Sequence, residues 1–305
     1  MNFRLWVFVL ILVSAGWLTL SDMIDEDGDG DGDWGQLEGG WGNLKEFFQE
    51  SMWPPDWKVL DARSWPPCEA KTDFFCSVAY TGMIETIQIA FIATSIGFIF
   101  AILFSVIAAR NLVPAWISIP IRIILAATRS LPSLIWAIFF VIIIGFGPLS
   151  GIFAMTFYTI GYLGKLQYET IEGMASGPLE AGRAMGLYRH EIVLGIVIPE
   201  NSNNLISQLL FMFEYNVRHG SVIGIVGAGG IGYSIHTYLK MLQYDKVFAL
   251  LIVIFVVVIV IDLVSMLLRS FFIDEGDIRR PKWSSIFLTP NQIINEKNQT
   301  GKNNS

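Results

Sequence analysis

The sequence predicts an all-α polytopic membrane protein whose chain crosses the bilayer about six times. Hydrophobic residues make up 53% of the chain and charged residues 15%, and the mean hydropathy is +0.53, which excludes an ordinary soluble globular domain. Apolar runs long enough for a hydrocarbon core of about 30 Å recur along the chain, without the alternation typical of transmembrane barrel strands. They cover residues 5–20, 79–108, 131–147, 149–166, 203–226 and 245–270.

The distribution of charge orients these spans. Residues 21–77 hold fourteen acidic and four basic side chains, a net charge of −10, whereas the whole chain carries −7, which leaves +3 elsewhere. Basic residues mark the cytoplasmic side of a membrane protein. We therefore expect the 21–77 loop outside and both termini inside. The basic residues are Arg4, Arg110, Arg122, Arg129, Lys165, Arg183, Arg189 and a group from Arg269 to Lys282.

The first run, residues 1–20, is predicted to be an N-terminal transmembrane anchor. A signal peptide is the alternative, because Arg4 precedes a short apolar core. The residues Ser14-Ala15-Gly16 offer no clear small-x-small cleavage site, which favours the anchor. The orientation of the other five spans is the same in both cases.

The acidic external loop contains a candidate calcium site. The stretch "DGDGDGDWGQLE" fits the D-x-[DN]-x-[DN]-G-x₅-E pattern of a calcium-binding loop. A flexible acidic tether is the alternative, since a repeated Asp-Gly makes the match easy. The candidate ligands are Asp27, Asp29, Asp31, Asp33 and Glu38.

The rest of this loop holds the two cysteines and a layer rich in Trp and Pro. Cys68 and Cys76 form a disulfide if the compartment is oxidising, and are otherwise two free thiols. Residues 52–67 ("MWPPDWKVLDARSWPP") suit the headgroup region of a membrane. We expect this layer to anchor the loop, or to help receive a partner protein.

The middle of the chain is predicted to form an interfacial helix followed by a hairpin. Residues 114–129 carry Arg122 and Arg129 on an apolar background, which indicates a helix at the interface. Residues 131–147 and 149–166 are predicted to be two spans that turn outside the membrane at Gly145-Phe146-Gly147-Pro148.

A polar segment, residues 178–191, interrupts the spans on the cytoplasmic side. Pro178 suits a first helical turn, and Pro199 is expected to break the helix before the next span. Gly182 and Gly186 lie four residues apart and would share one helical face, which would let a partner approach the backbone. We predict a short docking helix. An ordinary amphipathic connector is the alternative.

The same segment resembles the EAA loop of ABC importer permeases. The pattern Glu-Ala-Ala, three residues, Gly, nine residues, Ile-x-Leu-Pro corresponds here to Glu180, Ala181, Gly182, Gly186, Ile196, Ile198 and Pro199, with glycine for the second alanine and isoleucine for leucine. The pieces "ETIQIAFIATSIG", "TRSLPSLIWAIFFV" and "FEYNVRHGSVIGIVGAGGIG" are further similar to phosphonate-type permeases.

The resemblance implies a five-span importer permease core in the cell inner membrane, preceded by the anchor. Together with the charge distribution and the apolar runs, it divides the chain into a periplasmic loop at 21–77, a permease transmembrane domain at 78–272 and a cytoplasmic tail at 273–305. Its implied partners are a second permease copy, a separate ABC ATPase that binds ATP, and a periplasmic solute-binding protein. The implied solute is a phosphonate, phosphite or phosphate. Importers of another small polar solute and passive channels are the alternatives.

Residues 203–226 carry two charged residues, Glu214 and Arg218, where a lipid-facing charge costs about 2.5–3.5 kcal/mol. Glu214 and Arg218 are four residues apart on one helical face. They are either an ion pair that locks the helix against its neighbours, or part of a substrate path in which Arg218 receives the anionic solute and Glu214 positions it. His219 is a weaker candidate for the same path.

Other motifs exclude further classes. "GAGGIG" at 227–232 matches a dinucleotide-binding pattern but follows a predicted membrane helix instead of a strand, so a helix break is expected. No G-x-x-x-x-G-K-[ST] sequence occurs, so ATP is expected only on a partner. His190, His219 and His236 have no metal-ligand or nucleophile context, so we expect no enzyme and no nucleic-acid partner.

Overall fold

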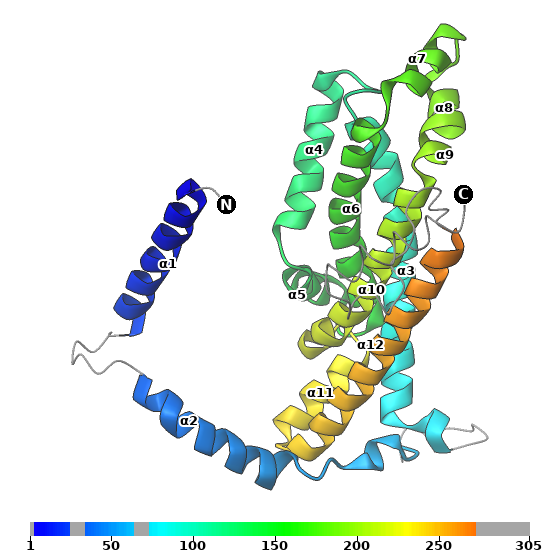
Figure 1. Ribbon diagram of the computed structural model, residues 1–305. Coiled ribbons are helices and arrows are strands. Elements are labelled where there is room, and N and C mark those ends of the chain that lie inside the picture. The colour runs from blue at the N-terminus through cyan, green and yellow to red at the C-terminus, as the bar shows by residue number, and fades with distance from the viewer. Residues whose placement is uncertain (1–2, 25–33, 64–72, 273–305) are drawn as a thin grey trace, which may run out of the picture.

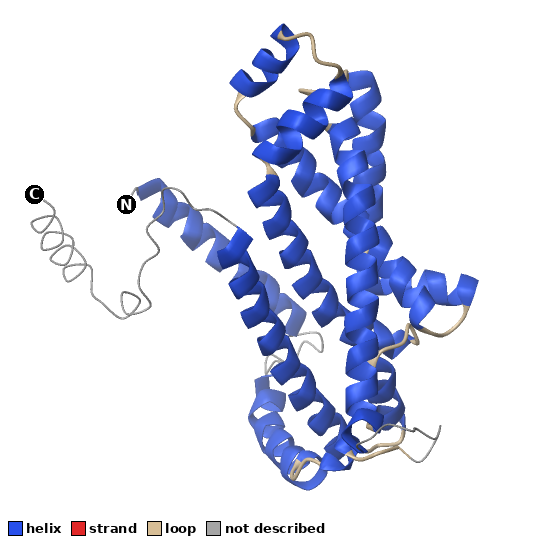
Figure 2. Ribbon diagram, turned by 90° about the vertical axis from the view of Figure 1, so that its right-hand side faces the viewer, coloured by secondary structure: helices blue, strands red, loops and turns tan. Residues whose placement is uncertain are grey.

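The computed structural model describes residues 3–24, 34–63 and 73–272, and these residues form helices and connecting turns with no strand among them (Figure 2). The predicted all-α class is confirmed. The long helices run roughly along one axis, with α7, α8 and α9 at one end and α11 at the other (Figure 1). The long helices are α3 (Val78–Ala108), α4 (Ala115–Ser130), α6 (Pro148–Gly173), α10 (Ser202–Ile223) and α12 (Tyr244–Phe272).

Helix α6 lies at the centre of the bundle and packs against α3, α4, α5 and α10. The side chains on its buried face are mostly small, so neighbouring helices approach closely. For example, a Cβ at Gly97 of α3 would lie 2.5 Å from the Thr159 methyl. Asn216 of α10 joins all three helices, since its amide donates to Thr94 Oγ1 (2.8 Å) and Thr159 Oγ1 (3.0 Å). A buried amide such as that of Asn216 is tolerated in the core because it makes hydrogen bonds to neighbouring side chains.

Three helical stretches are long and apolar enough to cross a membrane by themselves: 78–108, 202–240 and 244–270. A fourth is the bent pair formed by α4 and α5, and 6–20 is a shorter apolar helix whose residues are exposed. The central α6 has 26 residues and is about 39 Å long, but it is less apolar than these three stretches. It packs against neighbouring helices on several sides, so fewer of its side chains need to be apolar. The predicted count of six spans therefore exceeds what length and composition establish alone.

The predicted interfacial helix at 114–129 and span at 131–147 are wrong. Helix α4 runs beside α6, whereas α5 (Ser133–Ile144) turns away from it by 88° (Figure 1). With 12 residues, α5 is about 18 Å long, too short to cross alone. The bend follows from Pro132, which forces Leu131 into an extended conformation (φ −97°, ψ 136°).

Arg122, one of the two charges that suggested an interfacial position for α4, is accommodated against α6. Arg122 pairs with Glu172 of α6 and stacks over the Tyr168 ring, 4.3 Å from its centroid. Gly161 and Gly164 of α6 make room for α4, because a Cβ at either would meet Leu125 or Thr128. Helix α4 thus packs along α6 through one face, on which Ser118 and Leu125 are buried.

The glycine-rich stretch after α10 breaks the helix, as predicted, and no strand precedes it. Gly227, Gly229 and Gly230 have left-handed backbones, with φ of +90°, +82° and +73°. Between them and α10 lies the short η5 (Gly224–Val226), and α11 (Ile231–Lys240) follows. The first amide of α11 donates to Thr86 Oγ1 of α3 at 2.9 Å, which caps the new helix.

The described part of the external loop meets the end of the bundle near α11. It contains α2 (Trp34–Phe47), η1 (Phe48–Met52), η2 (Trp57–Leu60) and η3 (Asp73–Cys76). Val59 is buried in a cluster with residues of α3, α11 and α12. Phe48 packs edge-on against Phe248 of α12, while Trp53 and Trp57 stay exposed. Helix α1 (Phe3–Ile24) is exposed from 6 to 20.

Candidate functional site

The predicted single docking helix at 178–191 is two helices joined by a turn. Helix α7 (Ser176–Ala184) is followed by a left-handed residue, Gly186 (φ +75°), and then by α8 (Arg189–Ile192). The amide of Gly186 donates to the Arg183 carbonyl (3.0 Å) and that of Leu187 to the Gly182 carbonyl (3.2 Å). These two backbone hydrogen bonds, together with a left-handed glycine, form a Schellman motif, which ends a helix. The sequence reads "AMGLY" at this point, a signal that could have located the end of α7.

The expectation that Gly182 and Gly186 share a face is wrong. A Cβ at Gly182 would lie 2.5 Å from Ile196 Cδ1, so this glycine faces the protein's own backbone segment that leads to α10. Gly186 lies beyond the helix, with no atom within 4 Å of a Cβ. Gly182 therefore lets α7 pack closely, and Gly186 shapes the turn.

The arm formed by α7 and α8 is attached firmly to the bundle. Leu179 and Ile192 are buried with Val197 and with residues of α3 and α6. The Arg183 guanidinium donates to the Asn111 carbonyl in the loop after α3 (2.5 Å). The arm therefore packs against the ends of α3 and α6.

Helix continues from the arm towards α10 with only a one-residue interruption. A π-helical turn, η4 (Val193–Val197), precedes the three-residue α9 (Ile198–Glu200), in which Pro199 lies. The interruption comes at Asn201 instead of Pro199, and the Asn201 amide side chain donates to the Val197 carbonyl (2.8 Å). Proline lacks an amide hydrogen, and a π turn ahead of it accommodates the ring.

The outer surface of the arm is exposed and partly apolar. Met185 is 69% exposed and Tyr188 is 72% exposed, and Tyr188 stacks on His190 with ring centroids 5.8 Å apart. Glu180 and Ala181 are exposed on the adjacent turn. Large apolar side chains that protrude among charges at a helical tip are typical of a protein contact.

The predicted pair Glu214–Arg218 exists as part of a larger ionic network between α10 and α12. The two side chains are 3.8 Å apart, but Arg218 makes its shorter contact with Asp262 (2.6 Å), and Glu214 accepts a bond from Arg269 (3.1 Å). The Glu214 side chain is 14% exposed and that of Arg218 is 45% exposed. The partners on α12 were missed because 44 and 55 residues separate them from α10.

His219 lies in a different place, a cavity of about 390 Å³ beside the α4–α5 bend. Its ring stacks on Tyr215 at 3.7 Å, and the Tyr215 hydroxyl donates to that of Tyr158 at 3.1 Å. Arg129 also lines this cavity and makes no ion pair among the described residues. The structure thus brings His219, but neither Glu214 nor Arg218, to a cavity that offers a cation and hydroxyl groups. We call it the tyrosine cavity.

Arg129 lies near mid-depth in the bundle. A Cβ at Gly161 of α6 would be 2.9 Å from its backbone nitrogen, and Gly161 is halfway along the 26-residue α6. A cation without an acidic partner at this depth marks a functional path more often than a structural contact. The sequence alone had placed Arg129 at the membrane surface.

The predicted calcium ligands cannot be placed. Asp27, Asp29, Asp31 and Asp33 lie outside the described residues, and the Glu38 side chain does too, although its backbone belongs to α2. Among the described residues, no group of three or more His, Cys, Asp or Glu is placed to hold a metal. Cys76 is buried and disulfide-bonded, and Cys68 lies outside the described residues.

An apolar helical bundle with a firmly attached, exposed two-helix arm and a polar cavity at mid-depth defines a membrane transport subunit. More specifically, the chain belongs to the binding-protein-dependent transport system inner membrane component family, whose sequence model matches residues 76–273. It is therefore an ABC importer permease of the inner membrane. In this family the permease is not catalytic, a separate ATPase hydrolyses ATP, and a binding protein delivers the solute.

Similar proteins include two transport permeases. The chain is 36% identical to the phosphite transport system permease protein PtxC of Stutzerimonas stutzeri, over 62% of this chain and 70% of that protein. It is 36% identical to the phosphate-import permease protein PhnE of Mycolicibacterium smegmatis, over 63% of this chain and 36% of that protein. Among solved structures, the MetNI methionine ABC transporter in an inward-facing conformation matches with a TM-score of 0.58 at 21% identity, over 64% of this chain and 96% of that one, and shows the shared fold.

Proposed function

We propose that this permease imports a phosphorus oxyanion, such as a phosphonate, phosphite or phosphate. The observation that carries this proposal is the 36% identity to permeases named for phosphite and for phosphate. The tyrosine cavity supports it, because Arg129 offers a guanidinium whose planar donors suit tetrahedral oxyanions. The hydroxyls of Tyr158 and Tyr215 would add neutral donors, which hold an anion without binding it too tightly to leave.

We propose that the arm transmits the work of ATP hydrolysis. The exposed residues Glu180, Ala181, Met185 and Tyr188 would contact the ATPase, which alone binds ATP. Motion of the arm would pass through Ile196 and Pro199 into α10, which carries Tyr215 and His219. The tyrosine cavity would thus open and close as the ATPase moves.

A second permease copy would complete the path. Arg129 is exposed in the single chain, although it lies near mid-depth. A charge at this depth is unfavourable against lipid, so its surroundings would be a water-filled path between two copies in the bilayer. Glu214 and Arg218 are the further candidates for this path, and their pairing with α12 favours the structural role.

The test is uptake by proteoliposomes that contain the permease, its ATPase and its binding protein. We expect phosphite, phosphate or a phosphonate to accumulate only when ATP is supplied. Arg129→Gln should reduce accumulation at least tenfold, since a hydrogen bond to a charged group contributes about 1.5–3 kcal/mol. The control Lys165→Gln removes a charge that already pairs with Glu169 on the surface of α6.

Two results would contradict the proposal. Equilibration of the anion without ATP would indicate a passive channel. ATP-driven accumulation of a different polar solute, with no uptake of any phosphorus oxyanion, would assign the importer to another substrate.

A further inference from the structure

A groove lies where the arm meets the bundle. It has a volume of about 260 Å³ and lies between the end of α3, the loop that follows α3, and the arm itself. Its charged lining residues are Arg183 and Arg189, and the others are apolar side chains such as Val106, Leu112 and Ile192. We call it the arm groove.

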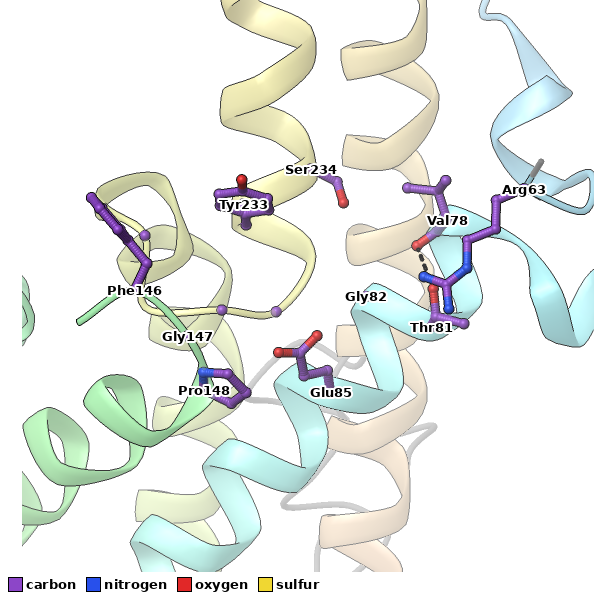
Figure 3. Close-up of a pocket in the computed structure, with 13 residues that line it drawn as sticks. Arg63, Val78, Thr81, Gly82, Glu85, Phe146, Gly147, Pro148, Tyr233 and Ser234 are labelled. Carbon is purple, nitrogen blue, oxygen red and sulfur yellow. Dashed lines mark hydrogen bonds between the residues drawn. The ribbon is translucent and has the colours of Figure 1, made fainter. Parts of the chain in front are cut away.

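The arm groove contains two cations and no anion to neutralise them. None of the described residues that line it is acidic. Arg183 donates to the Asn111 carbonyl (2.5 Å), which leaves further donors on its guanidinium, and Arg189 makes no ion pair or side-chain hydrogen bond among the described residues. The cavity at the opposite end of the bundle differs in this respect, because Glu85 lines it together with Arg63 (Figure 3). The arm groove therefore has a positive charge that the fold leaves uncompensated.

The arm groove lies at the level of a membrane surface. Helix α3, one of the stretches long enough to cross a membrane, ends at Ala108, shortly before Leu112. Trp116, in the first turn of α4, is 75% exposed, and tryptophan is enriched at the headgroup level of a bilayer. The described part of the acidic external loop meets the other end of the bundle (Figure 1). The arm end, with its arginines, is therefore the cytoplasmic end.

Apolar walls and uncompensated arginines at the cytoplasmic surface suit an anionic phospholipid. The phosphate of a headgroup accepts hydrogen bonds from the planar donors of a guanidinium, and the apolar walls would cover the glycerol and the upper acyl carbons. Basic pockets between membrane helices on the cytoplasmic side bind anionic headgroups in this way. A free phosphate ion would use the arginines alone and would leave the apolar walls in contact with water, so the lining favours the lipid.

We propose that the arm groove binds an anionic phospholipid of the cytoplasmic leaflet, with its phosphate against Arg183 and Arg189. Arg183 belongs to the arm, whereas Val113 belongs to the loop after α3, so one lipid would join the two elements. Neither Met185 nor Tyr188, which we assign to the ATPase contact, lines the groove. The lipid site is thus distinct from that contact, and it does not depend on which solute the permease imports.

The experiment is native mass spectrometry of the permease–ATPase complex after equilibration with equal amounts of phosphatidylglycerol and phosphatidylcholine. Both lipids carry the phosphate, but choline neutralises it in the second. Each basic residue near a membrane surface favours anionic lipid about fivefold, so we expect phosphatidylglycerol to be retained roughly 25-fold over phosphatidylcholine. Arg189→Gln should lower this preference about fivefold, and Arg183→Gln with Arg189→Gln should remove it. Arg110→Gln is the matched control, because Arg110 is exposed at the same end of the bundle and does not line the groove.

Equal retention of the two lipids by the parent complex would overturn the proposal. Equal losses in Arg110→Gln and Arg189→Gln would also overturn it, because they would indicate general surface charge instead of a site. Inorganic phosphate is the third probe: if it displaces phosphatidylglycerol from the parent complex, the groove holds a free anion and the lipid assignment is wrong. Should the double variant not assemble, because Arg183 also holds the Asn111 carbonyl, Arg189→Gln alone decides, and an unchanged preference in that variant overturns the proposal.

Discussion

The turn at Gly186 offers the sharpest test of the arm. Because nothing lies within 4 Å of a Cβ at this position, a valine there meets no neighbour, and its effect comes from the left-handed backbone (φ +75°). That conformation costs a residue with a side chain about 1–2 kcal/mol. A penalty of this size lowers the population of the native turn roughly 5- to 30-fold. Gly186→Val should therefore loosen the end of α7 without disturbing the core.

We expect such a permease to assemble with its ATPase but to import less solute per ATP. The two hydrogen bonds that close the turn fix the direction of α7 relative to α8, and a loosened turn would transmit less motion to α10. The assay is the ratio of solute accumulated to ATP hydrolysed in proteoliposomes. The matched control is Gly186→Asn, because asparagine tolerates the left-handed conformation and is similar in size to valine.

Two outcomes would refute the reasoning. Equal losses in the Val and Asn permeases would show that bulk at the contact, and not the backbone of the turn, determines transport. A Val permease with the parent ratio of solute to ATP would show that the Gly186 turn has no part in coupling.

Three further predictions concern other parts of the chain. If Arg218 only completes the ionic network, exchanging it with Glu214 should restore assembly and much of the transport, whereas a path residue should already fail as Arg218→Lys, because lysine loses the planar fork. Thr86→Val removes the acceptor for the first amide of α11 and should destabilise the permease by about 1–3 kcal/mol, measured by thermal unfolding, whereas Thr86→Ser should not. We also propose that the acidic loop binds calcium at roughly 10⁻⁴–10⁻³ M, measured by calorimetry on the full chain and lost in the Asp29→Ala, Asp31→Ala double variant; heat that only reflects ionic screening would leave the loop an acidic tether.

The sequence alone predicted the class, the position of the arm and the helix break at the glycines. These features depend on local properties: the length of an apolar run, a run of charges, and residues such as Gly230 that end helices wherever they occur. The pattern Glu180-Ala181-Gly182 with Gly186 also indicated where the arm lies. It suggested one helix instead of two, because Gly186, which was expected to form part of a contact face, lies in the turn that ends α7.

Only the tertiary structure decided which faces meet. Arg122 suggested a surface helix until Glu172, 50 residues away, was found beside it, and Arg218 pairs with a carboxylate 44 residues away. Hydropathy determines that a segment enters the membrane, but the partner of each charge depends on helix rotation and bending, which the packing of the whole bundle determines.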